Sequence, residues 1–446
     1  MKFTFTRTLL AALCASAPLL AACDPATNPG FTFPTADGGA LGGDGGASVA
    51  PDGGPVTADG GPVTAYQDCP APGDGGVAAS NLVSMNLQTG QIQKKVDLSC
   101  FAENTGYPRP ASLASTQGKV YVALQDFDRF FTNFKNGKVV VIDPVTDRVL
   151  RKIELANKTN ISDLRVGPTG LLYVVAQGTL GLDFPGFFAD PGLSGGIDII
   201  DPVTDTIVAS IDDDLFGGNV TKLEVVSTTR AYAIIAKWDT TVIPKENKYL
   251  IKRFDPSAGT VEAAPVYAAT GAFVSGMVYD AATGFLYVAE GDYVDPRVVA
   301  IRESTGVLDA SRTTPLTLTP QSMDLYLHAG ERKLVVAEPD FSGGVGAVQV
   351  IDVTRTPPLV AVTAPEPVSS DPVVRVQSIP GTLPNVPTAF VINRFGADNI
   401  QWLDPTAGFA TRRIGGVPAQ WSTGNGSNPQ DALPVSPTKL YVTLQQ

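Results

Sequence analysis

The chain has 446 residues, a formal net charge of −12 and a single histidine. An acidic balance argues against nucleic-acid partners and against direct contact with anionic lipid headgroups. The histidine, His328, lies in an apparent turn, where we expect a surface or packing role. The usual general base for a serine or cysteine nucleophile is therefore missing, which argues against that class of hydrolase.

The first 22 residues predict a targeting segment. Lys2 and Arg7 give a positive start, and the apolar stretch 9–20 is too short to be a comfortable membrane span. It ends in Leu20-Ala21-Ala22-Cys23, which resembles a bacterial lipobox. The resemblance implies cleavage before Cys23 and lipidation of that cysteine, which would anchor the protein to a membrane of the cell envelope, facing the periplasm or the cell surface. The alternative is an ordinary secretion signal with a coincidental cysteine.

A low-complexity tract follows the lipobox. It contains Asp-Gly-Gly at 37–39, 44–46, 52–54 and 59–61, and the repeat Gly-Pro-Val-Thr-Ala at 54–58 and 61–65. Because this composition cannot bury a core, we expect a flexible linker over 23–76. The expected organisation is a signal peptide at 1–22, the acylated linker at 23–76 and one folded domain at 77–446.

Four cysteines are present, at positions 14, 23, 69 and 100. Cys14 leaves with the signal peptide, and Cys23 is the expected lipid site. In an oxidising envelope compartment the two remaining cysteines usually pair, so we expect a disulfide between Cys69 and Cys100 that ties the end of the linker to the domain. Two separate thiols are the alternative.

The rest of the chain repeats a pair of short strands seven times. The first strand reads like Lys-Val-Tyr-Val-Ala and recurs at 119–123, 171–174, 231–234, 285–289, 333–337, 389–392 and 439–442. The second reads like Ile-Asp-Pro and recurs at 142–144, 200–202, 254–256, 351–352 and 403–405, with weaker copies at 85–87 and 301–303. Asp favours the first position of a type I turn and Pro the second, so each Asp-Pro pair should end a strand. A regular array of short strands that repeats about every fifty residues predicts an all-β fold, a seven-bladed β-propeller.

The two series are out of phase at the termini, which predicts one blade shared between the two ends. Its strands would come from 431–446 and 81–98, and their pairing would cover two open sheet edges. The other six blades are expected at 111–155, 161–213, 220–269, 274–316, 320–367 and 373–419.

The segments 139–149 and 197–207 resemble the repeat of the YVTN-type β-propeller family. The name motif of that family is nearly present at Tyr441-Val442-Thr443-Leu444, where its last position is Leu rather than Asn. The resemblance spans about 77–446 and implies the fold. It implies little about function, because the family mixes surface proteins, envelope binding proteins and relatives of enzymes.

Long loops from the second to the third strand of each blade should gather on one face. Three of them share the pattern Ala-x-x-Asp-aromatic, and two are looser versions. The candidate ligand-binding rim consists of Asp126, Phe127, Trp238, Asp239, Asp292, Tyr293, Asp340, Phe341, Arg394 and Phe395. Such a ring of carboxylates and aromatics would bind a cation, a sugar or a peptide. In the structural interpretation, each Asp caps backbone amides of its loop and each aromatic covers a blade edge.

Two neighbouring loops are rich in phenylalanine, at positions 127, 130, 131, 134, 184, 187 and 188. These rings either pack on one another or form an apolar patch that marks a partner site. We expect a monomeric, non-catalytic binding or scaffold module that uses its long-loop face, with an envelope protein, a peptide or a glycan as partner and with no cofactor. The alternative is a carboxylate- and metal-dependent hydrolase of the lactonase type with a divalent cation, although no acid pair is identifiable from spacing.

Overall fold

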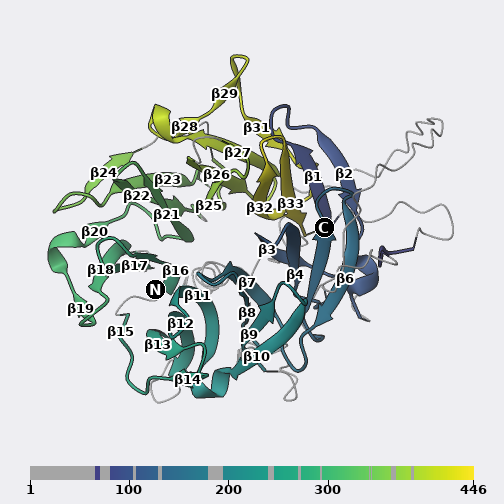
Figure 1. Cartoon of the computed structure of the whole chain (residues 1–446). Helices are drawn as coiled ribbons and strands as arrows, with labels where there is room; N and C mark the ends of the chain where they lie inside the picture. Colours follow the sequence, from purple (N-terminus) through teal and green to yellow (C-terminus); the bar gives the residue numbers. More distant parts are fainter. Residues whose placement is uncertain are drawn as a thin grey trace, which may run out of the picture.

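Seven β-sheets of four or five strands surround a central channel in the computed structural model (Figure 1). The structure describes residues 66–70, 81–103, 107–128, 133–178, 194–239, 246–269, 273–291, 294–340, 342, 344–362, 368–382 and 386–445. Each sheet is an antiparallel meander whose first strand lies nearest the channel. The expected all-β, seven-bladed β-propeller is therefore confirmed. Within these ranges no helix has the length and apolar character needed to cross a membrane.

The strands of the first three blades follow the expected spacing. Blade 1 contains β3 (Pro110–Thr116), β4 (Lys119–Leu124), β5 (Lys138–Asp143) and β6 (Arg148–Glu154). Blade 2 contains β7 (Ile161–Val166), β8 (Leu172–Ala176), β9 (Gly196–Asp201) and β10 (Thr206–Asp212). Blade 3 contains β11 (Asn219–Ser227), β12 (Arg230–Asp239), β13 (Glu246–Asp255), β14 (Thr260–Val261) and β15 (Tyr267–Ala268).

The next three blades vary most in their outer strands. Blade 4 contains β16 (Phe273–Asp280), β17 (Phe285–Gly291), β18 (Arg297–Arg302), β19 (Val307–Leu308) and β20 (Thr314–Pro315). Blade 5 contains β21 (Ser322–His328), β22 (Glu331–Glu338), β23 (Ala347–Asp352) and β24 (Leu359–Val362). Blade 6 contains β25 (Pro372–Ser378), β26 (Pro387–Asn393), β27 (Asn399–Asp404), β28 (Ala410–Thr411) and β31 (Gln420–Ser422), with the hairpin β29 (Arg413–Ile414) and β30 (Val417–Pro418) between the last two. Short 3-10 turns are η2 (Ser99–Phe101), η3 (Asp213–Leu215), η4 (Ala310–Arg312) and η5 (Pro405–Ala407).

The two ends of the chain share blade 7, as the phase offset of the repeats predicts. Its strand order is β32 (Pro429–Ser436), β33 (Lys439–Leu444), β1 (Leu82–Asn86) and β2 (Ile92–Val96). In the register between β1 and β33, Leu82 lies opposite Thr443 and Asn86 opposite Lys439. The C-terminal strand thus pairs on both sides, with β32 and with β1.

The Asp at the end of the third strand makes the turn that the sequence predicts. In each of five blades its side chain accepts a hydrogen bond from the backbone N–H two residues later, at 2.8–3.0 Å. These five residues are Asp143, Asp201, Asp255, Asp352 and Asp404. Asn86 does the same in blade 7 by accepting from the N–H of Gln88 at 2.8 Å. A short polar side chain thus ends each of these strands by competing for a backbone donor.

Apolar side chains from the second and third strands fill the spaces between neighbouring blades, one cluster for each pair. The tyrosine of the second strand also reaches the next blade. Tyr121 donates to Asp205 at 2.7 Å, and Tyr232 and Tyr441 donate in the same way to Glu303 and Asp147. The repeated Tyr therefore combines apolar burial with a hydrogen bond that links consecutive blades.

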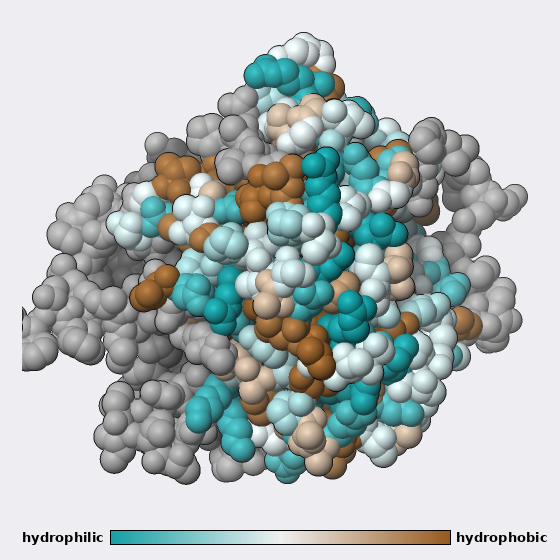
Figure 2. Space-filling view, turned by 90° about the vertical axis from the view of Figure 1, so that its left-hand side faces the viewer, coloured by the Kyte–Doolittle hydropathy of each residue, from teal (hydrophilic) through white to brown (hydrophobic). Residues whose placement is uncertain are grey.

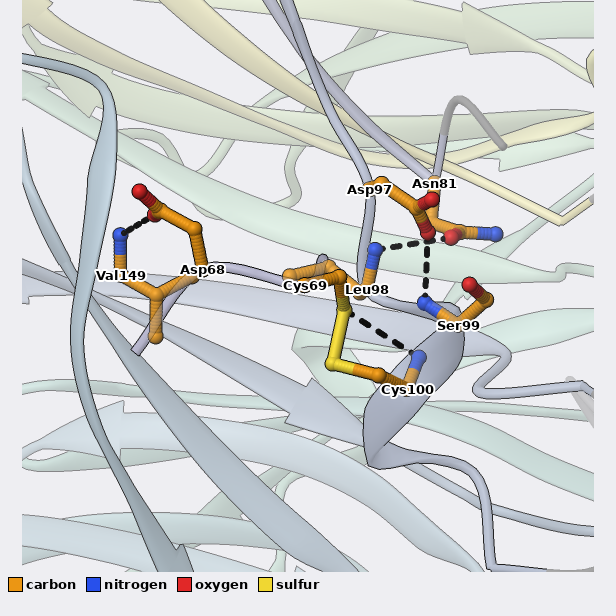
Figure 3. The surroundings of a disulfide bond; sticks show 8 residues. All are labelled: Asp68, Cys69, Asn81, Asp97, Leu98, Ser99, Cys100 and Val149. Carbon is orange, nitrogen blue, oxygen red and sulfur yellow. Dashed lines mark hydrogen bonds between the residues drawn. A yellow bond between two sulfur atoms is a disulfide. The ribbon is translucent and has the colours of Figure 1, made fainter. Parts of the chain in front are cut away.

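Residues 66–70 lie along β6, the outer strand of blade 1, and are linked to blade 7 by a disulfide. The backbone N–H of Gln67 donates to the carbonyl of Val149 at 2.8 Å, and Val149 donates back to the carboxylate of Asp68 at 2.7 Å. Cys69 and Cys100 form the expected disulfide, with their Cα atoms 5.5 Å apart (Figure 3). This segment, which falls within the expected linker, therefore covers an outer sheet edge and joins two neighbouring blades.

Candidate functional site

The structure buries the first two residues of the expected rim. Asp126 is fully buried, and its carboxylate is 2.6 Å from the ammonium of Lys138, which is also fully buried. Phe127 is packed between Phe134, with ring centroids 5.3 Å apart, and the guanidinium of Arg109, 4.7 Å from the ring centroid. These two residues therefore stabilise their own loop and do not lie on the open surface of the rim.

Asp340 lies at the corresponding place in blade 5 and makes a different set of contacts. Its Oδ1 accepts from the hydroxyl of Ser342 at 2.5 Å and from the backbone N–H of Ser342 at 2.9 Å, and these two hydrogen bonds lower the pKa of the carboxyl. Just before it, the buried Glu338 accepts from the backbone N–H groups of Thr317 and Leu318 at 3.0 and 2.6 Å, and burial raises the pKa of Glu338 to about 7. Both carboxylates are engaged by backbone amides.

Trp238 and Asp239 belong to a strand and not to a loop. The hairpin of β12 and β13 continues past the expected loop boundaries, so Asp239 pairs with Glu246 and Trp238 with Asn247. The long loop that the sequence predicts around Trp238 and Asp239 is thereby shortened, because the two strands continue their backbone hydrogen bonding beyond the body of the blade. Other sequence-predicted positions lie outside the described residues: Cys23, Phe130, Phe131, Phe184, Phe187, Phe188, Asp292, Tyr293 and Phe341.

Arg394 and Phe395 are the rim residues that the structure places beside the channel. Arg394 is 4% exposed and lines a cavity at the end of the channel, and its Nη2 is 2.8 Å from the carboxylate of Asp371. Phe395 is 41% exposed, with the Arg394 guanidinium 5.8 Å from its ring centroid, and has φ of 45°. A positive φ is uncommon for a bulky side chain and costs free energy.

The long-loop end of the channel is surrounded by amide side chains that the sequence analysis did not single out. Gln445 donates to the side chain of Gln125 at 3.1 Å, and Gln125 donates to Asn160 at 3.1 Å. On the other side of blade 7, Arg394 donates to Gln430 at 3.1 Å. Gln125, Arg394 and Gln445 each follow directly on the second strand of a blade, so the meander brings the three together at this end.

Inside the channel, side chains of one inner strand hold the backbone of the next. Each inner strand is a sheet edge, and its free N–H groups face the neighbouring blade. Side chains accept from these groups at 2.8–3.2 Å, in the pairs Ser112 to Leu164, Glu224 to Tyr279, Ser322 to Val374, Asp324 to Val376 and Asp431 to Leu113. Polar residues on the inner strands thus join blades where no backbone ladder exists.

Charged side chains of both signs gather on the inner strands. Arg165 lies 3.0 Å from Asp163, and Arg375 lies 3.0 Å from Asp431. Burial opposes ionisation of Asp163, but Arg165 and two further cations outweigh it and hold the pKa of Asp163 below its usual value. Burial raises the pKa of Glu224 to about 7 and lowers the pKa of Lys222.

The cavity at the long-loop end has a volume of about 90 Å³. Its polar lining comes from all seven inner strands, and blade 4 contributes Ser275 beside Gly276. A Cβ at position 276 would lie 3.0 Å from the backbone nitrogen of Met323, so glycine permits the close approach of β16 and β21. The cavity offers hydrogen-bond donors, acceptors and both charges to a small polar ligand.

The carboxylates described at the rim do not converge on a common point. The carboxylate of Asp126 pairs with the ammonium of Lys138, and that of Asp340 accepts a hydrogen bond from a backbone N–H of its own loop. Among the described residues, the only three carboxylates whose oxygens lie within 4.8 Å of one another are Asp212, Asp213 and Asp214 at the start of η3. Two of these already bind protein donors: Asp212 the ammonium of Lys158 at 3.1 Å, and Asp213 the backbone N–H of Gly195 at 3.2 Å. The side chains needed for a rim metal site are therefore not assembled in the described part of the chain.

One side of the ring shows how its outer surface is built (Figure 2). Apolar side chains form small groups separated by hydrophilic ones, and among the described residues of this view no continuous apolar patch is visible. The exposed apolar residues of the described part of the chain are likewise spread over different blades, for example Val145, Val208, Val307 and Leu359. The outer side therefore gives less reason to expect a binding site than the channel end.

No protein-family model and no curated protein matches this chain. Among solved structures, it is similar to the hydrazine synthase of Kuenenia stuttgartiensis, with a TM-score of 0.50 and 12% identity over 75% of this chain and 91% of that chain. The Dos1 propeller (TM-score 0.45, 12% identity, 75% and 78% coverage) and the Cps50 (Swd1) β-propeller domain of Myceliophteria thermophila (0.44, 10%, 76% and 97%) are further matches. At these identities the likeness shows the fold alone, and the class of protein is a seven-bladed β-propeller.

Proposed function

We propose that this protein is a lipid-anchored β-propeller of the bacterial cell envelope, of the YVTN-repeat kind, that acts as a non-catalytic binding module through its long-loop face. Propellers commonly serve as binding or scaffold modules. The lipobox resemblance at Cys23 and the Gly-rich tract after it support the anchor and the tether. Rigid scaffolds usually carry binding on the loops that they hold in place, and here Gln125 and Arg394, at the start of two of these loops, line the end of the channel.

Phe395 is the observation that carries the binding role. It presents an exposed aromatic ring beside an arginine that lines the cavity, and it does so at φ of 45°. Strained residues of this kind persist where the surrounding structure imposes them, often at ligand sites. Gln177, at the same level of blade 2, is buried with neither side-chain polar atom bonded to another described residue. An exposed aromatic ring and a channel end lined by amides suit a peptide or a glycan, whose polar groups need both donors and acceptors.

Replacing Phe395 by Asn tests this face. Asn tolerates a left-handed backbone better than other side chains, so the variant removes the ring while it keeps the loop conformation. We expect binding to a peptide or glycan ligand, identified on defined arrays, to fall about tenfold or more, as for an aromatic hot spot. The matched control is Leu327→Asn, which removes a similarly exposed apolar side chain from the opposite face. Equal binding by both variants, or no ligand on either array for the unmodified protein, would remove the support for this face.

The lipid anchor makes a separate prediction. The mature protein is expected to begin at Cys23 with acyl chains on that residue, and Cys23→Ser should abolish the modification and leave the protein unprocessed or released. Mass spectrometry of the purified N-terminus measures both. An unmodified mature terminus at another residue would show that the lipobox resemblance is coincidental.

A further inference from the structure

The cavity at the long-loop end of the channel has more cations than carboxylates in its lining. The charged residues are Arg165, Lys222, Arg375, Arg394, Asp163, Asp324 and Asp431. Three of the four cations lie in ion pairs of 2.8–3.0 Å with Asp163, Asp431 and Asp371. The fourth cation is Lys222, whose side-chain ammonium makes neither a hydrogen bond nor an ion pair to any described residue.

The carboxylates near Lys222 are held by other groups. Asp431 accepts from the backbone N–H groups of Leu113 and Ala432, both at 2.8 Å. Asp324 accepts from the backbone N–H of Val376 and from that of Leu325, both at 2.9 Å. Since these bonds join the inner strands of neighbouring blades, a carboxylate that turned to Lys222 would leave a backbone donor unpaired.

Asp163 and Glu224 are engaged in the same way. Asp163 pairs with Arg165, and Glu224, two residues beyond Lys222 on β11, accepts from the backbone N–H of Tyr279 at 3.2 Å. These carboxylates thus lie near the ammonium of Lys222, but none of them contacts it directly. Because Lys222 is only half-buried in the cavity lining, its ammonium is open to an anion that enters the cavity, where a charge-assisted hydrogen bond can form.

We propose that Lys222 binds a small oxyanion in this cavity, a carboxylate or phosphate group of a few heavy atoms. This site lies in the same cavity that Arg394 lines, but it does not depend on the exposed ring of Phe395. The volume of about 90 Å³ is several times the space that one ordered water needs, so the cavity has room for a small ion. The hydroxyl of Ser275, also in the lining, bonds to no described residue and adds a second donor for an anion.

Isothermal titration calorimetry on the purified mature protein tests the site, with sodium acetate and sodium phosphate as separate probes. Ionic strength is held constant with sodium chloride in every titration. We expect saturable binding of at least one probe, a loss of about tenfold or more in affinity for Lys222→Gln, and retained binding for Lys222→Arg. The control is Lys94→Gln, which removes the same charge from an exposed position of β2.

Acetate binding without phosphate binding would identify a carboxylate site, and the reverse would identify an inorganic oxyanion site. If Lys222→Gln does not fold, the melting temperature of the unmodified protein supplies the readout, which should rise saturably with the same probe and do so for Lys222→Arg too. The proposal is overturned if neither probe binds saturably, or if Lys222→Gln and Lys94→Gln bind equally well. Neither result would bear on the ligand array outcome for Phe395.

Discussion

Deleting residues 438–446 is expected to prevent the protein from accumulating in a folded, soluble form. The deletion removes β33, whose Leu440, Tyr441 and Val442 are fully buried and which pairs with β1 and β32 at once. Two sheet edges would then be open inside the ring, and open edges promote aggregation. Soluble yield, size-exclusion chromatography and circular dichroism measure the effect.

The matched control removes only residues 445–446, which leaves all of β33 in place. This shorter deletion should give near-normal yield and a melting transition close to that of the full chain. A folded, monomeric protein after the longer deletion would contradict the closure by a shared blade.

Replacing Asp126 by Asn should produce the largest effect of a single substitution. It breaks a fully buried ion pair and leaves the ammonium of Lys138 with the half-exposed carboxylate of Glu103 at 3.6 Å and the carbonyl of Asn136 at 3.1 Å. Breaking such a pair typically costs up to about 3–5 kcal/mol of unfolding free energy. Asn also tolerates the left-handed backbone at this residue, where φ is 49°, so the loss of charge is isolated from backbone strain. Urea denaturation at neutral pH measures the change.

Two further variants make the result interpretable. Asp340→Asn alters the same motif position in another blade, where the side chain only caps its own loop, and should cost no more than about 1 kcal/mol. Adding Lys138→Met to Asp126→Asn should recover part of the lost unfolding free energy, because the buried ammonium of Lys138 is then removed as well. Equal effects of Asp126→Asn and Asp340→Asn would mean that the buried ion pair contributes little.

The architecture could be predicted because its signals are local and repeated. The tyrosine-valine strands and the Asp-Pro turns recur at a regular spacing, and each turn needs only the Asp and the two residues after it. The shared blade followed from counting where the two series begin and end. The disulfide between Cys69 and Cys100 could be expected because no other pair remained.

The candidate site was harder to predict, because its contacts join residues far apart in the chain. Asp126 and Asp340 occupy the same motif position, yet one meets a lysine 12 residues later and the other meets its own loop. The motif alone cannot distinguish them, because the difference depends on which residue of the following strand lies opposite the aspartate. An aspartate in a repeated loop motif is therefore weak evidence for a ligand site.

The charged channel left a signal in the sequence that the analysis did not use. The inner strands read Ser162-Asp163-Leu164-Arg165 and Thr221-Lys222-Leu223-Glu224, with charges alternating with leucine. This alternation is unusual for the innermost strand of a blade, and it marks side chains that point toward the channel. Their partners are typically about one blade further along the chain, such as Val376 for Asp324, and a single strand cannot reveal them.

The path of residues 66–70 has a consequence for how the molecule is oriented. Tyr66 is beside the turn between β5 and β6, where its hydroxyl is 3.4 Å from both Asp143 and Thr146, and the segment then follows β6 toward Cys100. The chain therefore joins the ring on the face of the short turns, opposite the channel end with Phe395. A pull transmitted through the N-terminal tract would act on that short-turn face. An attached molecule would turn its amide-lined mouth away from the surface that holds it.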